Sequence, residues 1–450
     1  MAARTAWTLL HAVPLGAACL GLLQVSDLAH HPVLTLGLLG AAFLWLPFAA
    51  RRLEAAGGRS GGAIMLSALV LRVALLPLPL TLSDDALRYL WDGKVAMAGF
   101  DPYAAAPAAT ELIPLRDEIW PRLPHKQVPT VYPPLAMTAF SIATRLPFPL
   151  LAWKTIVTAA DLAACALLLE LARRRGIAPG RTVWYAWNPL VLLEIAGMGH
   201  VDALGVAAVV GTVLGLTPRP GEERPAAPVA SGLGAAAGIL AKLAPVLALP
   251  MWARQSGRPG RFLAVSLGLV AIAAAPVVAA THGVPPGLVR YAISWEFNGP
   301  LFEPLWRLLA ASGAAPALAR ALDHYKTWSG QWGRWNFLYP YLYPQLLAKA
   351  VLAVGTLAAV VRSVRDRDPV AGSGRLFGWL LLLSATVYPW YVLWVLPWAA
   401  LARHTAWRAL SALILLAYLP RITGLPLVPW VFFAIWVPFG VLLLFGRGWE

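Results

Sequence analysis

Long apolar segments separated by short polar gaps occur along almost the whole chain. The first three cover residues 7–24, 33–50 and 62–82. A helix needs about 20 apolar residues to cross a bilayer, so segments of this length predict transmembrane helices. Residues 7–24 lack a small-residue cleavage site and are expected to be retained as a helix. Further crossings are expected at residues 150–172, 183–197, 200–216, 262–281, 345–361, 376–388, 391–401, 407–419 and 427–445.

The basic residues are gathered in alternate polar gaps. Examples are the clusters 51–59, 173–181, 254–261 and 362–375, whereas the intervening gaps 24–32 and 197–200 are almost free of Lys and Arg. Cytoplasmic loops of membrane proteins carry the excess of Lys and Arg. The pattern therefore predicts an all-α polytopic bundle of about 12–14 transmembrane helices with both termini in the cytoplasm.

Two apolar segments do not fit a single crossing. Residues 133–147 are too few to span a bilayer, so they predict a juxtamembrane helix on the outer surface. A single crossing by residues 229–253 would export the basic cluster 254–261. We therefore expect two short broken helices that turn outside at residues 242–245, since irregular backbone is tolerated where it lines a water-filled cavity.

These segments divide the chain into five regions. They are N-terminal transmembrane helices at 1–82, a first outer loop at 83–149, a transmembrane core at 150–281, a second outer loop at 282–344 and C-terminal transmembrane helices at 345–450.

Composition excludes several other classes. Apolar residues make up 59% of the 450 and charged residues only 13%, which is unlike a soluble domain. The net charge of +15 follows the membrane gaps and not one face, so no nucleic-acid partner is expected. Walker, GxGxxG, HExxH and GxSxG motifs are absent, and the short inner loops leave no room for a nucleotide-sugar domain. The two cysteines form no disulfide framework or metal spacing.

The richest polar stretch follows the third apolar segment. It begins Ser83-Asp84-Asp85 and lies in an outer loop that carries seven of the 21 acidic residues. Two adjacent carboxylates at a membrane surface should have a raised pKa in at least one member, which suits a general base. Ser83 or Asp84 would equally serve as a helix N-cap, and the two interpretations are compatible.

The motifs S-D-D-x-x-R-Y-x-W-D-G at 83–93, G-x-D-P-Y at 99–103 and P-T-V-Y-P-P-L at 129–135 occur in this order. They resemble the first outer loop of the GT-C superfamily of integral membrane glycosyltransferases, in particular its bacterial mannosyltransferase-like branch. Trp187-Asn188-Pro189-Leu190 and Gly199-His200-Val201-Asp202-Ala203 are similar to later markers of that branch, although Val201 replaces a common Asn. Residues 241–245, 295–298 and 389–391 are also similar to later markers of that branch.

The resemblance implies a GT-C-like bundle that moves a sugar, mannose or a related one, from a polyprenyl-phosphate donor to an acceptor hydroxyl with inversion. The acceptor would be a glycan or glycolipid, and the active site of this multi-pass inner (cell) membrane protein would face the periplasm or cell exterior. Asp84 and Asp85 are the catalytic candidates. The candidates for substrate binding are Arg88, Tyr89, Trp91, Asp92, Lys94, Asp101, Tyr132, Glu194, His200, Asp202 and Lys242.

The chemistry of these residues is compatible with that reaction. A carboxylate can take the proton of an acceptor hydroxyl, and a phosphate leaving group needs cations, for which Lys242, Arg88, Lys94 and Arg421 are placed near the outer surface. His200 and Asp202 would line the sugar side. No metal is required, and Mg²⁺ or Mn²⁺ at Asp84 and Asp85 is the open alternative.

A membrane transporter or flippase of lipid-linked sugars is the rival function. Transporters carry charged residues at mid-membrane on broken helices and often contain inverted repeats. Here the acids are concentrated in an outer loop and no repeat is visible. A third alternative is an inactive lipid-binding homologue, but the acidic pair shows no sign of decay.

Overall fold

The protein is built from helices. The computed structural model describes residues 2–57, 60–222, 227–425 and 428–449. Within these ranges the only β-pairing is an isolated bridge between residues 297–298 and Thr386. Six of the described helices are long and apolar enough to cross a membrane: α1 (Ala2–Val25), α2 (Pro32–Ala56), α6 (Pro149–Arg174), α12 (Pro259–Ala280), α16 (Pro344–Ser363) and α21 (Val428–Phe445). The predicted all-α polytopic membrane fold is confirmed.

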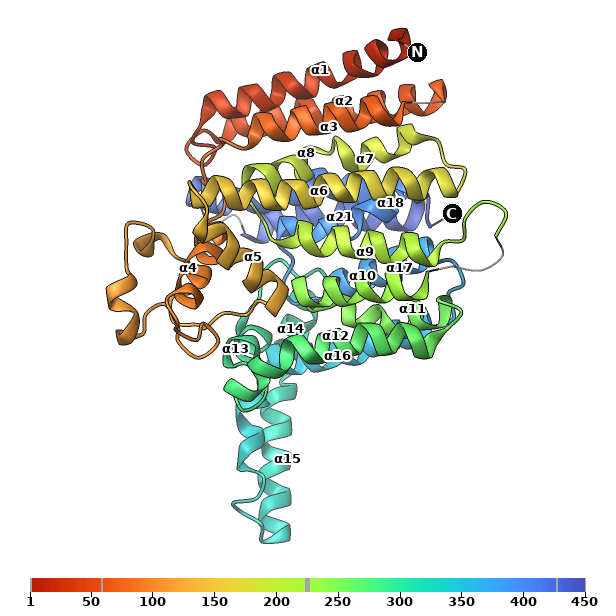
Figure 1. Cartoon of the computed structure of the whole chain (residues 1–450). Helices are drawn as coiled ribbons and strands as arrows, with labels where there is room; N and C mark the ends of the chain where they lie inside the picture. The colour runs from red at the N-terminus through yellow and green to blue at the C-terminus, as the bar shows by residue number, and fades with distance from the viewer. Residues whose placement is uncertain (1, 58–59, 223–226, 426–427, 450) are drawn as a thin grey trace.

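These helices lie alongside one another in a bundle (Figure 1). Between them are the shorter apolar helices α3 (Gly61–Leu75), α9 (Asp202–Leu216), α10 (Pro228–Ala241) and α19 (Thr405–Leu413). Helix α9 packs between α6 and α10, and α10 also packs on α12. Helix α1 begins and α21 ends at the right of Figure 1, opposite the loop helices on the left. The number of crossings and the five-region division stay predictions.

Several bundle segments are broken, and their freed backbone groups are bonded by side chains. The segment that follows η3 (Pro179–Thr182) consists of α7 (Val183–Ala186), α8 (Pro189–Leu192) and a π-helical turn, η4 (Leu193–Gly197). At its break, the Asn188 side chain accepts a 3.0 Å hydrogen bond from the Leu190 amide and donates to Trp184 O and Ser411 Oγ, both at 3.0 Å. Such bonds make an interruption tolerable at membrane depth.

The predicted break near Lys242 is confirmed. Helix α10 ends at Ala241, and the chain returns through η5 (Ala244–Ala248) and α11 (Leu249–Gln255). Pro245 and Pro250 each lie near the start of one of these short helices, where a missing amide hydrogen costs little.

Two predicted boundaries are wrong. The segment expected at residues 62–82 is α3, which ends at Leu75 because Pro77 and Pro79 do not continue a helix. The segment expected at residues 376–388 is α17 (Pro369–Leu382), which begins seven residues earlier. The reason is an N-cap, because Asp368 Oδ1 accepts hydrogen bonds from Val370 N at 2.8 Å and Ala371 N at 3.4 Å. Beyond Leu382 the chain leaves the helix and continues to η7 (Pro389–Trp394) and α18 (Leu396–Ala402).

A buried ion pair that sequence reasoning missed joins α3 to α6. Arg72 and Asp161 lie 2.7 Å apart with both side chains fully buried. Arg72 also donates to Ala186 O at 2.8 Å, and the Tyr185 hydroxyl donates to Asp161 at 2.6 Å. Charged residues inside apolar segments are uncommon, so both could have been found from their position in the sequence.

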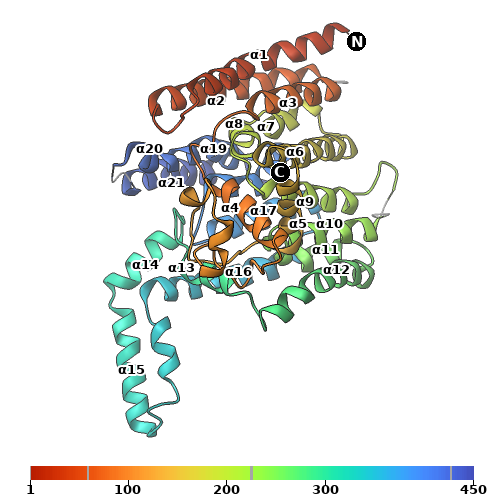
Figure 2. The same cartoon turned by 60° about the vertical axis from the view of Figure 1, so that its left-hand side comes forward.

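The two outer loops contain helices of their own. The first holds α4 (Asp85–Met97), η1 (Thr110–Leu115), η2 (Trp120–Arg122) and α5 (Pro134–Arg145), the last of which is the short helix predicted at 133–147. The second holds α13 (Pro286–Ser294), α14 (Phe302–Ala311), α15 (Ala314–Ser329) and η6 (Asn336–Tyr341). Helix α15 projects away from the bundle in both views (Figures 1 and 2). The chain closes through η8 (Ile414–Tyr418) and α20 (Leu419–Thr423) before α21.

Candidate active site

A cavity of about 770 Å³ lies where the first outer loop meets the bundle. The adjacent acids Asp84 and Asp85 line it, and so does Lys242 at the break after α10. Its walls come from the start of α4, the loop 124–133, the Lys242 turn, α13, α17, η7 and the end of η8. The lining residues include Ser83, Asp84, Asp85, Arg88, Tyr89, His125, Tyr132, Lys242, Tyr291, Trp295, Tyr388, Trp390, Tyr391, Trp394 and Tyr418.

The two acids have different surroundings. Asp84 occupies the N-cap position of α4 without a capping hydrogen bond from its side chain. Its Oδ1 lies 2.7 Å from Arg122 Nη2, which also donates to Leu80 O at 2.7 Å. The Asp85 amide instead donates to Ser83 Oγ at 3.3 Å, so Ser83 supplies the local turn bond. Asp84 is therefore held in an ion pair beside the cavity.

Asp85 lies at the cavity end of a row of buried polar groups. Its Oδ2 is 3.9 Å from His200 Nδ1, and His200 Nε2 is 3.2 Å from Glu194 Oε2. The Tyr418 hydroxyl is 3.0 Å from both Glu194 oxygens. The His200 ring also stacks on Trp390 with centroids 3.7 Å apart. His200, Glu194 and Asp202 are completely buried and do not line the cavity, unlike the sequence-based expectation that His200 and Asp202 line its sugar side.

The turn at Gly199 and the π-helical turn η4 bring His200 and Glu194 together. Gly199 has φ +77°, a conformation that a side chain disfavours, and its carbonyl accepts a 2.7 Å hydrogen bond from Trp153 Nε1. The His200 amide donates back to Glu194 O at 3.0 Å. The backbone thus folds His200 over Glu194.

Lys242 forms the cationic side of the cavity. Its Nζ lies 2.6 Å from Asp202 Oδ1, which also accepts a 2.6 Å hydrogen bond from Trp394 Nε1. The ammonium is 4.2 Å above the Tyr391 ring, and the Tyr391 and Tyr291 hydroxyls are 2.6 Å apart. Asp202 is fully buried, whereas a quarter of the Lys242 side chain is exposed. An ammonium has three donors, so two remain for a ligand in the cavity.

The amino-acid comparisons point to a single activity. Residues 3–256, more than half of the chain, match the family described as alpha-(1->6)-mannopyranosyltransferase, N-terminal domain. The chain belongs to this family. The predicted resemblance to membrane mannosyltransferases is thereby confirmed.

A relative in the genus Mycolicibacterium supports the same assignment. Over 409 residues the chain is 24% identical to the probable alpha-(1->6)-mannopyranosyltransferase of Mycolicibacterium smegmatis. The match covers 76% of this chain and 66% of that protein, just under two thirds of the relative's length. No solved structure matches the chain.

Arg88 contacts the cavity but its charged group is already bonded. Its Nε lies 2.7 Å from Asp92 Oδ1, and its other nitrogens donate to Val128 O at 2.7 Å and His125 O at 3.1 Å. Arg88 therefore ties the stretch 124–128 to α4. Burial raises the pKa of Asp92, although the Arg88 charge opposes that rise. Asp92 lies behind the wall and does not line the cavity.

The structure places three further candidates outside the cavity. Lys94 bonds to Leu115 O at 2.7 Å and Asp117 at 2.6 Å, and Asp101 accepts the Tyr103 amide at 2.8 Å. Trp91 is completely buried. At 3.6 residues per turn, Lys94 lies about half a turn around α4 from Asp85, so both cannot face one cavity. Tyr89 and Tyr132 line the cavity, and their role in substrate binding stays a prediction.

The second half of the chain contributes an aromatic wall that the motifs only partly indicated. Tyr388 stacks on Trp390 with centroids 4.6 Å apart and on Phe297 at 4.7 Å. The ring centroids of His125 and Trp295 lie 4.4 Å apart. Trp295, Phe297 and Trp390 lie within the markers at 295–298 and 389–391, whereas His125 and Tyr388 lie outside them.

No group of three or more His, Cys, Asp or Glu side chains that could hold a metal ion occurs in the part of the chain that the structure describes. The side chain of Arg421, a further predicted cation, lies outside the described residues.

Proposed function

We propose that this protein transfers mannose from a polyprenyl-phosphate donor to a hydroxyl of a mannose-containing glycan, forming an α-(1→6) linkage. The family and the mycobacterial relative support the mannosyl group and the linkage. The observation that carries the proposal is one cavity lined by a carboxylate, Asp85, an ammonium, Lys242, and many aromatic rings.

The reaction is a single displacement at the anomeric carbon of mannose. The acceptor oxygen forms a bond to C1 while the bond from C1 to the phosphate oxygen breaks, and the electron pair of that bond leaves with the lipid phosphate. The acceptor's proton passes to Asp85 as the attack develops. A single displacement inverts C1, so an α-linked product requires a β-linked donor.

Asp85 is the better base of the acidic pair. Asp84 Oδ1 already accepts a 2.7 Å hydrogen bond from Arg122 Nη2, so this oxygen is occupied by a neighbouring side chain. Asp85 Oδ2 lies 3.9 Å from His200 Nδ1, beyond hydrogen-bond distance, and His200 Nε2 lies 3.2 Å from Glu194, which is bonded to Tyr418. We propose that His200, placed next to Asp85, acts as a positioning residue for this carboxylate.

Lys242 is the cation for the leaving phosphate. A lipid phosphate needs no proton to depart, but it gains from a charge-assisted hydrogen bond in a water-poor site. Asp202, which also accepts a hydrogen bond from Trp394, holds the Lys242 ammonium at 2.6 Å. The donor is a phosphodiester with one negative charge, and the leaving lipid monophosphate has less charge to neutralise than a nucleotide diphosphate, so we propose that the reaction needs no divalent metal.

The membrane orientation supports a donor from the outer leaflet. The arginines at the end of α6 lie at the opposite end of the bundle from α4 and α5 (Figure 1). By the positive-inside rule those arginines are cytoplasmic, and the cavity then opens on the non-cytoplasmic face of the cell membrane. The polyprenyl chain of the donor would remain in the bilayer beside the cavity.

The experiment is a transfer assay on the purified full chain in lipid nanodiscs. The reagents are a polyprenyl-phosphate β-mannose and an α-mannose oligosaccharide, and product linkage is read by mass spectrometry and NMR. We expect one α-(1→6)-linked mannose to be added, with equal yield in the presence of a chelator. Asp117→Asn, which changes a surface carboxylate outside the cavity, is the matched control for Asp85→Asn.

A transporter would give another result. It would move a fluorescent lipid-linked sugar across sealed vesicles without forming a glycosidic bond. Translocation without product would overturn the proposed transfer. Loss of product on chelation would identify the acidic pair as a metal site and remove the base role of Asp85.

A further inference from the structure

A second hollow, of about 290 Å³, lies beside the connection between α16 and α17, away from the active-site cavity. Three arginines and one acid surround it together with an apolar wall. The lining residues that matter are Arg362, Arg365, Arg375, Asp366, Leu376 and Trp379. We call this group the α16–α17 basic pocket.

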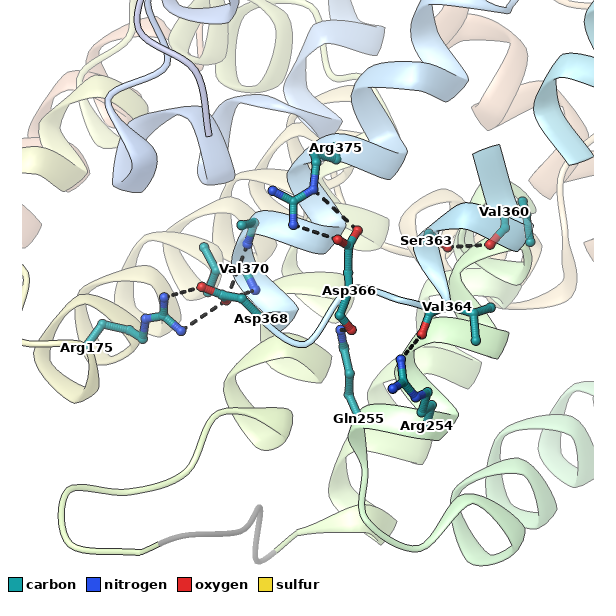
Figure 3. Close-up of polar contacts among 11 residues, drawn as sticks. Arg175, Arg254, Gln255, Val360, Ser363, Val364, Asp366, Asp368, Val370 and Arg375 are labelled. Carbon is teal, nitrogen blue, oxygen red and sulfur yellow. Dashed lines mark hydrogen bonds and ion pairs between the residues drawn. The ribbon is translucent and has the colours of Figure 1, made fainter. Parts of the chain in front are cut away.

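The connection is fixed by side chains from two other parts of the bundle (Figure 3). Arg254 of α11 donates to Val364 O, and Gln255 donates to Asp366 O at 3.0 Å. On the other side, Arg175 reaches Asp368 with bonds of 3.0 and 2.5 Å. A loop held at three points presents its remaining side chains in a defined arrangement.

The acids of the connection are already neutralised. Asp366 pairs with Arg375 at 2.7 Å, and Asp368 pairs with Arg175 while it caps α17. Arg362 and Arg365 are exposed, and neither side chain makes a hydrogen bond or ion pair with any residue that the structure describes. The pocket therefore has positive charge in excess, with two guanidinium groups free to bind an anion.

An apolar surface adjoins these arginines. Ala359 of α16 and Leu376 and Trp379 of α17 line the pocket together with the arginines, and Trp379 is 48% exposed. Helix α16 is one of the six helices of membrane-spanning length. The exposed apolar face of such a helix contacts acyl chains, and Trp favours the level of the lipid headgroups.

We propose that the α16–α17 basic pocket binds an anionic phospholipid. Arg362 and Arg365 hold the headgroup phosphate through charge-assisted, bidentate hydrogen bonds, and the acyl chains lie along Leu376 and Trp379. A free phosphate ion would use the arginines but not the apolar wall. Basic pockets between membrane helices bind anionic headgroups on the cytoplasmic side, where the positive-inside rule places this connection.

The test is a titration of delipidated protein with phosphatidylglycerol, followed by native mass spectrometry of the first retained lipid. The Arg362→Gln, Arg365→Gln double variant should bind this lipid about tenfold more weakly or worse. The Arg258→Gln, Arg261→Gln double variant removes the same charge from two exposed arginines outside the pocket, and it should stay within about twofold of the wild type. Equal losses in both variants would show unspecific surface attraction and overturn the proposal.

Two further arms separate a lipid from a phosphate ion and guard against misfolding. Trp379→Ala keeps all charges and should weaken phosphatidylglycerol binding several-fold, with inorganic phosphate at millimolar concentration displacing little lipid. Full displacement by phosphate together with an unaffected Trp379→Ala variant would overturn the lipid assignment. Mannosyl transfer in the pocket variants is read separately, so failure here leaves the proposed function untouched.

Discussion

Replacing Arg88 by Gln distinguishes two roles for this residue. As a donor-binding cation it would contact the lipid phosphate, and as a scaffold it would hold the outer loop. The structure favours the scaffold, because its guanidinium bonds to Asp92 at 2.7 Å and to three backbone carbonyls of residues 124–128. Only 8% of its side chain is exposed.

The size of the effect follows from the burial of the pair. Removing one partner of a buried ion pair costs about 3–5 kcal/mol, because the other charge stays buried and uncompensated. Asp92 is 3% exposed and would be that charge. At 1.36 kcal/mol per factor of ten, local opening of the loop should become about 10²- to 10⁴-fold more frequent.

Hydrogen exchange in nanodiscs measures this opening. The reporter is the Thr130 amide, which donates to Pro102 O at 2.9 Å across the loop. Its protection should fall in Arg88→Gln and recover in part when Asp92→Asn is added, because the double variant leaves no buried charge. Unchanged protection combined with a large loss of donor affinity would refute the scaffold role and restore Arg88 as a phosphate ligand.

Other predictions concern the cavity and the loop around it. Lys242→Gln should weaken donor binding about 10- to 100-fold, the worth of one charge-assisted hydrogen bond, as measured by titration with the lipid donor. Lys94→Gln should change donor affinity less than about twofold, because Lys94 bonds to Leu115 and Asp117 outside the cavity. Partial burial and the Arg88 charge lower the pKa of His125, so the folded loop binds fewer protons than the unfolded one. Proteolytic protection of the loop should therefore be full above a pH of about 6.5 and decrease below it, and His125→Gln should remove this dependence.

The membrane fold was predictable because the length of each apolar segment and the arginines next to it can be read directly from the sequence. The short helix α5 was expected because residues 133–147 are too few to cross a bilayer. The break at Lys242 was expected because a single crossing by residues 229–253 would place the basic cluster 254–261 outside. The helices of the second outer loop, including the projecting α15, were not predicted. They contain no long apolar run, and such a run was the signal used throughout.

The site was predictable only in part for a different reason. Asp84, Asp85, Tyr89 and Tyr132 line the cavity, and His200 lies directly behind it. Motif position cannot show which face of a helix a residue occupies, and Lys94 was misplaced by this ambiguity. The aromatic wall of η7 depends on contacts between segments almost 200 residues apart, such as the bond from Trp394 to Asp202.

The most direct measurement for the proposed reaction is the single-turnover rate of mannose transfer at saturating donor. The account predicts that Asp85→Asn lowers this rate about 10²- to 10⁴-fold, the usual contribution of a general base, with donor affinity nearly unchanged. Asp117→Asn should match the wild type in the same assay. A rate for Asp85→Asn within about tenfold of the wild type would contradict the central role of this carboxylate.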